Sequence, residues 1–133
     1  MEKTFFFELI TPSKNLISGD FDMVVVPGEE GDFGVLPHHS NLISQISPGI
    51  LNTYKNNKID ESFFLYSGFA EVSNNKLIVL SETAFDINEF KLNIYKDSIS
   101  KYEKLKNQTK SESEILFCEK KIEEANTIIE MLN

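Results

Sequence analysis

The chain has 133 residues, of which 41% are hydrophobic and 26% charged, a balance typical of a folded protein with one ordinary domain or two small ones. It has 21 acidic residues, 13 lysines and no arginine. The resulting formal net charge of −8 argues against nucleic acid as a partner. The single cysteine, Cys118, excludes an internal disulfide and suits a reducing cytosol.

The N-terminal segment does not have the pattern of a secretory leader. Glu8 and Pro12 interrupt the apolar run that begins at Phe5, whereas a leader needs roughly 7 to 15 uninterrupted apolar residues. No segment approaches the roughly 18 apolar residues that a membrane span requires. The sequence therefore predicts a soluble chain, which can still belong to a membrane-attached assembly.

Residues 1–86 contain short runs of β-branched and aromatic residues between turn residues. Pro12, Pro48 and the pairs Asn56-Asn57 and Asn74-Asn75 supply turn chemistry, and Asn74-Asn75 predicts a tight hairpin. Many short strands with frequent turns predict an antiparallel β-sandwich or barrel. The predicted strands are Thr4–Ile10, Leu16–Phe21, Met23–Val26, Phe33–Leu36, Leu42–Ile46, Gly49–Lys55, Ser62–Ser67, Phe69–Ser73 and Lys76–Leu80.

The segment 24–39 has the most informative pattern, because three glycines and two prolines punctuate a strand and its neighbours. Pro27-Gly28 ends the valine-rich strand, Gly31 and Gly34 permit backbone with positive φ, and Pro37 stops the following strand. Acids and histidines are thereby left on turns. Since loops held on a rigid sheet commonly carry binding function, this segment is predicted to be a docking loop.

Composition changes near residue 86. All six glycines, all four prolines and nine of the eleven phenylalanines precede it, and lysine and glutamate alternate with aliphatic residues afterwards. The sequence therefore predicts two domains, a β-sandwich over residues 1–86 and a helical domain over residues 87–133. The first carries 11 acids and 5 lysines up to Phe85, a net charge of −6, and the second 10 acids and 8 lysines, a net charge of −2.

The second domain is predicted to be an antiparallel two-helix hairpin. Ser111 and Glu114 form a capping pattern, which predicts that the chain turns near residue 110 and restarts as a helix. Each helix has one narrow apolar seam, so the hairpin needs support from a partner. The seams consist of Leu92, Tyr95, Ile99 and Tyr102 in the first helix, and of Ile115, Cys118, Ile122, Ala125, Ile129 and Leu132 in the second.

The residues give little support to chemistry at an active site. A metal site at His38 and His39 with the nearby acids is disfavoured, since adjacent residues of an extended chain point to opposite sides. Ser67 and Ser81 lack a plausible histidine and acid arrangement, and Ser67 is better explained by a turn between strands. The segment 27–31 lacks the lysine of a phosphate loop. Cys118 is interpreted as a small buried hydrophobe.

Three short motifs occur in the order found in one known family. Gly31-Asp32-Phe33-Gly34-Val35-Leu36-Pro37 with His39 comes first, Ser47-Pro48-Gly49-Ile50 follows, and Gly68-Phe69-Ala70-Glu71-Val72 is third. Together with the two-domain plan, they make the chain closely similar to the epsilon subunit of bacterial F-type ATP synthases, the counterpart of mitochondrial delta. The resemblance runs along the whole chain in order and length.

This resemblance implies a subunit with no active site of its own. In the family the sandwich packs on the gamma subunit and docks its loop end on the membrane ring of c subunits, so that the three rotate together as the central stalk. Basic residues are common on the ring loops, and Glu29, Glu30 and Asp32 are then the pairing candidates. The implied ring contact consists of Glu29, Glu30, Gly31, Asp32, Phe33, Pro37, His38 and His39.

The same resemblance implies a regulatory hairpin. In the family the helices fold back on the sandwich or extend along gamma into the catalytic alpha/beta head, where they block rotation in the hydrolysis direction. The lysines implied to make that contact are Lys91, Lys96, Lys101, Lys104 and Lys106, although a solvated helix face explains them equally well. The chain would then lie at the cytoplasmic face of the bacterial inner membrane, touching the membrane only through the complex.

Some bacterial members bind ATP at the start of the first helix through the pattern Ile or Leu, Asp, two residues, Arg, Ala. Here the corresponding residues are Ile87-Asn88-Glu89-Phe90-Lys91-Leu92. Asn88 replaces the acid, and Lys91 cannot reproduce the planar two-pronged donor of arginine. These departures argue against ATP binding, and no cofactor is expected.

Two other classes of function stay open. A stand-alone adaptor or ligand-binding β-sandwich with a helical dimerisation hairpin predicts a stable oligomer without affinity for gamma. A small metal-dependent β-enzyme predicts bound metal at the histidines. A gene position directly after that of the catalytic β subunit would favour the stalk.

Overall fold

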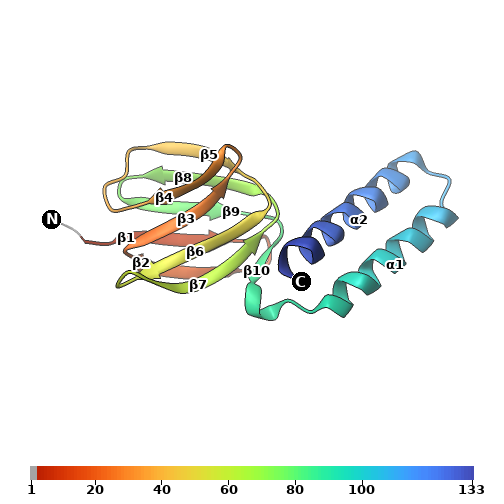
Figure 1. Cartoon of the computed structure of the whole chain (residues 1–133). Helices are drawn as coiled ribbons and strands as arrows, with labels where there is room; N and C mark the ends of the chain where they lie inside the picture. The colour runs from red at the N-terminus through yellow and green to blue at the C-terminus, as the bar shows by residue number, and fades with distance from the viewer. Residues whose placement is uncertain (1–2) are drawn as a thin grey trace. The chain divides into compact units, whose positions relative to one another are not determined.

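The computed structural model describes residues 3–133 and divides the chain into two compact units, one extending through Asn88 and the other spanning Glu89–Asn133 (Figure 1). The described part of the first unit holds ten strands, the second unit holds two α-helices, and a short 3₁₀-helix includes the last residues of the first unit and the first residue of the second. The strands are β1 (Phe5–Ile10), β2 (Asn15–Phe21), β3 (Met23–Gly28), β4 (Gly31–Val35), β5 (Leu42–Ile46), β6 (Gly49–Lys55), β7 (Lys58–Leu65), β8 (Gly68–Ser73), β9 (Lys76–Leu80) and β10 (Ala84–Asp86), and the 3₁₀-helix η1 is Ile87–Glu89.

The first unit is a β-sandwich built from one continuous sheet that folds over on itself. Hydrogen-bonded neighbours follow the order β10-β7-β6-β3-β5-β8-β9-β1-β2, and β4 pairs with β3 beside this path. All of these pairs are antiparallel except β1 with β9, which is parallel. The predicted fold, an antiparallel sandwich followed by helices, is confirmed.

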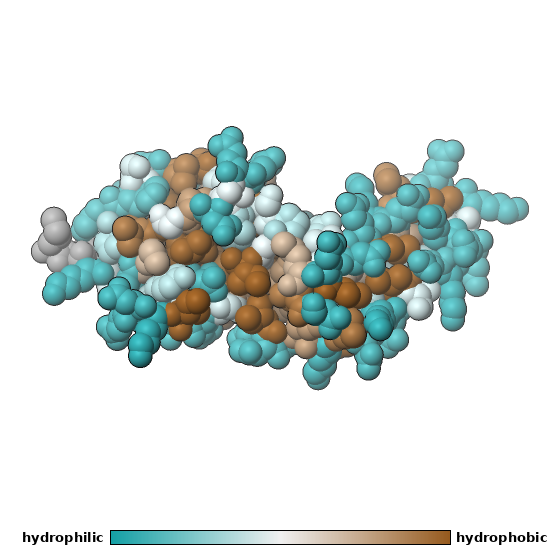
Figure 2. All heavy atoms as spheres, in the orientation of Figure 1, coloured by the Kyte–Doolittle hydropathy of each residue, from teal (hydrophilic) through white to brown (hydrophobic). Residues whose placement is uncertain are grey.

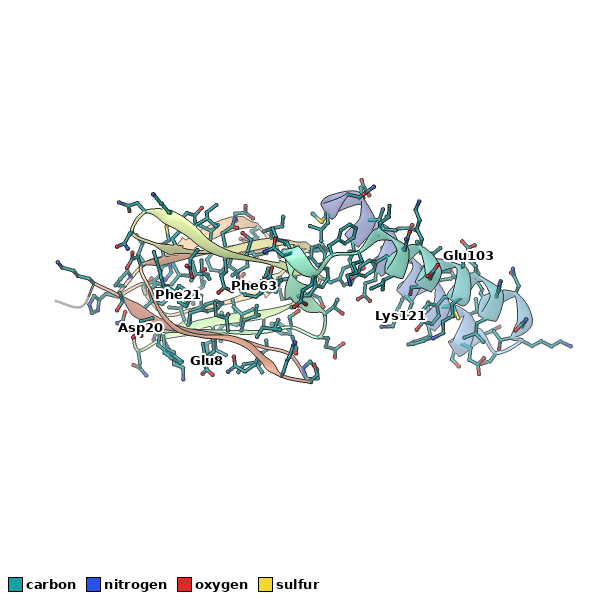
Figure 3. The ribbon with its side chains drawn as sticks, turned by 90° about the horizontal axis from the view of Figure 1, so that it is seen from below. Glu8, Asp20, Phe21, Phe63, Glu103 and Lys121 are labelled. Carbon is teal, nitrogen blue, oxygen red and sulfur yellow. The ribbon has the colours of Figure 1, made fainter. Side chains whose placement is uncertain are left out.

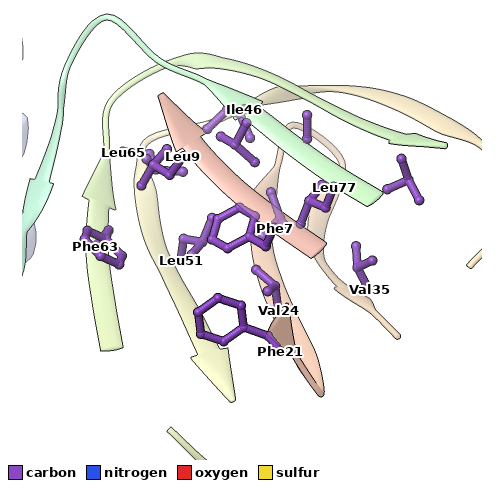
Figure 4. Packing of buried hydrophobic residues seen from close by; sticks show 14 of the residues in the cluster. Phe7, Leu9, Phe21, Val24, Val35, Ile46, Leu51, Phe63, Leu65 and Leu77 are labelled. Carbon is purple, nitrogen blue, oxygen red and sulfur yellow. The ribbon is translucent and has the colours of Figure 1, made fainter. Parts of the chain in front are cut away.

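The core of the sandwich follows from the alternation of side chains along its strands. In β1, Phe5, Phe7 and Leu9 are buried, whereas the intervening residues are partly exposed. Phe7 meets Phe21 edge to face with ring centroids 5.9 Å apart, and side chains from β1 to β9 close around them (Figure 4). Each such buried phenylalanine or leucine stabilises the fold by about 1.5–3 kcal/mol.

The outward side of the sandwich carries both polar and apolar residues. In Figure 3, Glu8 and Asp20 point away from the strands, whereas Phe21 and Phe63 lie between them. The Glu8 carboxylate accepts a hydrogen bond from the Asn15 amide at 3.0 Å and pairs with the Lys76 ammonium at 3.4 Å. Hydrophilic residues cover much of the face seen in Figure 2, and hydrophobic residues gather in patches between them.

The predicted strands differ from the observed ones mainly in β7 and β10. β7 begins at Lys58, four residues before the predicted start, because Asn56 and Asn57 both adopt positive φ and pair Lys58 directly with Lys55. The predicted hairpin at Asn74-Asn75 is confirmed, with φ values of 51° and 58°. β10 has only three residues and was not predicted.

The second unit is the predicted pair of helices, α1 (Leu92–Gln108) and α2 (Glu112–Leu132). Ser111 caps α2 by accepting a hydrogen bond from the Glu114 amide at 3.4 Å. The reciprocal half of the predicted capping pattern is absent among the described residues, because the Glu114 carboxylate accepts from the Thr109 hydroxyl at 2.6 Å instead. Tyr102 of α1 meets Phe117 of α2 edge to face at 5.9 Å.

The apolar seam of the helices is thin. Cys118 and Ala125 are buried as predicted, but the third buried position of α2 is Ile128 and not the predicted Ile129, which is only partly covered. No side chain among the described residues of α1 is fully buried. The hairpin therefore has far less core than the sandwich.

Candidate docking surface

The predicted docking loop is a hairpin formed by β3 and β4. Its register runs from Val24 opposite Val35 to Gly28 opposite Gly31, so Glu29 and Glu30 make the turn and are exposed. We call the end of the sandwich that carries Glu29 and Glu30 the turn end. Gly31 has a φ of 120°, a value that side-chain-bearing residues rarely adopt, which explains the glycine at this position.

Close backbone packing holds the turn end rigidly. The Glu29 amide donates to the Gln45 carbonyl and the Ser47 amide to the Pro27 carbonyl, both at 2.9 Å, so β5 and its following turn brace the hairpin. A Cβ atom on Gly28 would lie 2.9 Å from the Phe33 ring, and one on Gly49 would lie 2.7 Å from the Pro27 Cβ. Larger side chains at either glycine would push these segments apart.

A hollow of about 440 Å³ lies beside this turn, between the β3–β4 hairpin and β5. We call it the acidic hollow. Three carboxylates line it, and among its described lining residues there is no lysine or histidine. Its lining consists of Glu29, Glu30, Gly31, Asp32 and Phe33 from the hairpin, and of Leu42, Ile43, Ser44 and Gln45 from β5.

The β5 side of the acidic hollow was missed by the sequence interpretation. Ile43 is 73% exposed. It lies on the outward side of β5, opposite to the side on which Ile46 is buried. The signal was present in the sequence. In strict alternation Ile43 falls on the polar side of its strand, and an isoleucine there indicates a contact surface.

The predicted histidines lie elsewhere. Pro37, His38 and His39 follow the far end of β4, which five residues at about 3.3 Å each place roughly 16 Å from the turn end. The His38 amide donates to the Asn75 side-chain oxygen at 2.8 Å, and the Asn75 side-chain amide donates to the Thr4 carbonyl at 3.1 Å. The His39 ring nitrogen Nδ1 lies 2.7 Å from the Ser40 carbonyl oxygen.

The eight residues predicted for the ring contact therefore divide into two groups. Glu29, Glu30, Gly31, Asp32 and Phe33 lie together in the acidic hollow, and Pro37 with the two histidines lies at the opposite end of β4. The metal site considered at the histidines cannot include those acids. Within the described residues, no group of three or more histidine, cysteine or acidic side chains could hold a metal ion.

Ser67 and Ser81 lie at the turn end in structural roles. The Ser81 hydroxyl is 2.5 Å from the Ser67 carbonyl oxygen and 3.0 Å from that of Thr83, so it links the turn after β7 to the segment after β9. Ser67 precedes Gly68, whose φ is 142°. The interpretation of Ser67-Gly68 as a turn between strands is confirmed.

The five lysines predicted to act in regulation do not share one face of α1. Lys91 precedes the helix at its N-cap. With about 100° of rotation per residue, Lys101 and Lys104 lie about 60° apart, whereas Lys106 lies about 140° from Lys101. Lys106 also lines a groove between the helices with Glu103. One flat partner surface could therefore meet only some of these lysines.

The segment that replaces the ATP-binding pattern is held by local contacts. The Asn88 amide donates to the Asp86 carboxylate at 2.9 Å, and the Lys91 side chain is exposed and makes no capping hydrogen bond. Phe90 stacks on Tyr95 with centroids 5.5 Å apart and an angle of 13°. Burial, followed by the charges of Glu124 and Glu89, raises the pKa of Tyr95 above 10, so its hydroxyl stays neutral.

The first unit matches a known family. The family model for the β-sandwich domain of the ATP synthase delta/epsilon chain matches residues 4–87, which include the whole acidic hollow. The chain belongs to this family. A relative from Rhodospirillum rubrum, the ATP synthase epsilon chain, is 44% identical over 87 residues, which cover 65% of this chain and 65% of that relative. The chain thus spans slightly less than two thirds of this relative in the match.

Two solved structures share the fold. A chain of the Euglena gracilis mitochondrial ATP synthase assembly of OSCP, F1 and c-ring aligns with all of this chain and 84% of its own length, at 20% identity and a TM-score of 0.72. A chain of the Tetrahymena thermophila mitochondrial ATP synthase central stalk and c-ring covers 66% of this chain and 69% of its own, at 19% identity and a TM-score of 0.54.

Across residues 3–133, no helix is both long and apolar enough to cross a bilayer.

Proposed function

We propose that the chain is a rotor subunit of an F-type ATP synthase, with no active site of its own, that links the gamma subunit to the c ring. The acidic hollow is the observation that carries the proposal. It lies on a braced hairpin inside the stretch that matches the family, and it gathers three carboxylates beside an exposed isoleucine. Basic loops of a ring would find complementary charge there.

The proposal assigns the ring contact to the turn end and not to both ends of the sandwich. Glu29, Glu30 and Asp32 would meet the ring, with Ile43 adding apolar contact. Pro37, His38 and His39 point to a different surface, since about 16 Å of β4 separates the two groups. That second surface is available for gamma.

The hairpin is proposed to regulate the assembly by acting on the catalytic alpha/beta head. Its thin seam supports a helical pair that can exchange one packing for another. Lys101 and Lys104 are the two lysines that one acidic partner segment could reach together. Leu116 and Phe117 of α2, which are 54% and 51% exposed, offer apolar contact in addition. ATP is not expected to bind, and the subunit would lie at the cytoplasmic face of the membrane.

The ring assignment is tested by charge reversal in the assembled enzyme. Glu29→Lys with Glu30→Lys should lower proton-driven ATP synthesis several-fold while gamma still co-purifies with the chain at one to one. Asp20→Lys is the matched control, since Asp20 is exposed on β2 and points away from the sandwich core (Figure 3). Equal synthesis by the double variant and the control would remove the acidic hollow from the ring contact. Failure of the parent chain to bind gamma would overturn the stalk function itself.

A further inference from the structure

The last strand of the sandwich, β10, is also its shortest. It has three residues, whereas the other nine described strands have five to eight. It stands at the end of the sheet order, where β7 is its single partner in the described part of the sandwich, and all three of its residues are partly exposed. A short edge strand of this kind opens locally more often than the strands that enclose the core.

The chain is firmly held just before β10. The Ser81 amide donates to the Ile10 carbonyl, and the Tyr66 amide donates to the Thr83 carbonyl, both at 3.0 Å. The Ser81 hydroxyl also lies 3.0 Å from the Thr83 carbonyl oxygen. An opening of β10 would therefore stop at Thr83, which would act as its hinge.

One aromatic contact anchors β10. The ring of Phe85 packs on that of Phe64, with centroids 5.5 Å apart and an angle of 30°. Phe63 belongs to the core cluster, so Phe64, the next residue, points to the outer side of β7. The contact between Phe85 and Phe64 can therefore be broken without disturbing the core of the sandwich.

Like charges oppose the paired strand. Asp86 is opposite Phe63 in the register, and Glu61 lies two residues earlier on β7, so the two carboxylates are diagonal neighbours on one side of the sheet. Burial, followed by the charges of Asp60 and Asp86, raises the pKa of Glu61 above 4.5, against the opposing effect of Lys55. Repulsion between these carboxylates favours the open strand.

Opening of β10 would lengthen the connection between the sandwich and the helices. With β10 paired, residues 87–91 form this connection, and α1 begins at Leu92. With β10 open, the connection begins at residue 84 and gains three residues, or about 10 Å of extended chain. The hairpin could then reach correspondingly farther from the sandwich.

We propose that β10 is a releasable strand that sets how far the hairpin can reach, with Thr83 as its hinge and the contact between Phe85 and Phe64 as its latch. This inference rests on the proposed function, because reach matters only if the hairpin acts on the catalytic head. Paired β10 keeps the hairpin on a short connection, and open β10 allows it to reach the head.

Hydrogen exchange of the full chain, followed by NMR, measures the release directly. The protected amides of residues 84–86 should exchange about a hundredfold faster than those of β6 and β9. Phe85→Ala should raise their exchange about tenfold further, because the latch is lost. Asp86→Asn should lower it about threefold, since it removes one of the like charges and keeps an oxygen that can accept from the Asn88 amide. Exchange of residues 84–86 as slow as that of β6 would overturn the proposal.

Two matched substitutions serve as controls. Phe6→Ala removes a partly exposed phenylalanine from β1, and Asp20→Asn removes an exposed carboxylate from β2. Both should leave the exchange of residues 84–86 unchanged, and equal effects of a control and its β10 counterpart would contradict the latch. Circular dichroism checks that every variant folds. If Phe85→Ala does not fold, the opposite shift expected for Asp86→Asn still decides the question.

The assembled ATP synthase tests the consequence for regulation. Phe85→Ala should lower ATP hydrolysis about twofold or more, because the hairpin reaches the head more often, and Asp86→Asn should raise it. Gamma should co-purify with both variants as it does with the parent. Unchanged hydrolysis in spite of changed exchange would show that β10 does not control the reach of the hairpin.

The proposed regulation has a separate test. Lys101→Glu with Lys104→Glu should raise hydrolysis if the hairpin acts on the head. If this pair raises hydrolysis and the β10 variants leave it unchanged, the release proposal fails and the regulatory function stands. If the pair has no effect, the regulatory function itself fails, whereas the exchange measurements on the free chain still show whether β10 opens.

Discussion

The sandwich and the hairpin of this chain differ in how much apolar surface holds them together. Fifteen buried hydrophobic residues form one cluster in the described part of the sandwich, whereas α2 contributes three buried residues and the described residues of α1 none. At about 1.5–3 kcal/mol for each large side chain, this difference outweighs any gain from helix propensity. Its deep core allows the sandwich to present a fixed docking surface. The thin seam allows the two helices to exchange one packing partner for another.

Separating the two units should give the largest effect. A chain ending at Asn88 should unfold cooperatively with a melting temperature close to that of the higher-temperature transition of the parent. A peptide of residues 89–133 should lose most of its helix, because short helices with little buried area are marginal in water. Far-ultraviolet circular dichroism of both fragments measures this. A stable isolated hairpin would contradict the comparison, and so would an aggregated sandwich fragment.

Gly68→Ala should cause the next largest loss, and it should fall on the sandwich alone. The added methyl group would meet the Leu80 carbonyl oxygen at 2.0 Å in a backbone with a φ of 142°. We expect a loss of more than about 3 kcal/mol in the free energy of unfolding.

Gly19→Ala is the matched control for this substitution. A Cβ atom there would lie 3.7 Å from the Phe21 ring, which is ordinary contact. Its effect should stay within about 1 kcal/mol in urea titrations of both variants. If the two substitutions lower the free energy of unfolding by the same amount, the tight approach of β8 to β9 does not hold the turn end together.

Ser111→Ala should weaken the hairpin by about 1 kcal/mol and leave the sandwich unchanged. The Ser111 hydroxyl accepts the Glu114 amide at the start of α2, and alanine cannot replace that acceptor. Hydrogen exchange of α2 amides, compared with those of β6, would resolve the two units. Ser113→Ala provides a control, since Ser113 lies inside the helix two residues later and also bonds the Ser111 hydroxyl at 3.0 Å. Equal effects on α2 and β6 would show that the units unfold together.

Most of the sandwich could be predicted because its strands alternate and its turns carry asparagine, glycine or proline. β6 and β9 have the predicted bounds. β10 was missed because three residues show no period. The start of β7 was missed because Lys58 to Glu61 are exposed and three of these four residues are charged, so that only the paired asparagines reveal the hairpin.

The site was harder to predict than the fold. Acids and histidines that are close in sequence were assigned to one contact, but the five residues of β4 carry the histidines to the opposite end. A second hollow of the sandwich is lined by the ends of β1, β5, β8 and β9, which come from three separate parts of the sequence, so no local pattern predicts it. The scatter of the lysines around α1, by contrast, follows from their spacing alone.

The smallest expected effect concerns Glu61, on the exposed first half of β7. Partial burial of its carboxyl, followed by the charges of Asp60 and Asp86, raises its pKa above the ordinary value of 4.5, against the opposing effect of Lys55. A raised carboxyl pKa means that the folded chain holds this proton more tightly than the unfolded chain. The group therefore favours folding at low pH, and that contribution is lost as pH rises through the folded pKa.

Glu61→Gln should remove this dependence. The variant should melt slightly above the parent at pH 7, where the parent carries the disfavoured charge, and the gap should close below pH 4.5, where the parent is protonated in both states. Glu71→Gln, on the outward side of β8, controls for loss of charge alone. Melting curves at several pH values test this prediction. A difference in melting temperature between variant and parent that widens toward acid would mean that the Glu61 carboxylate is favoured in the fold. In that case even the polar edge of the sandwich would contribute to its rigidity, and its contrast with the hairpin would be greater than its core alone implies.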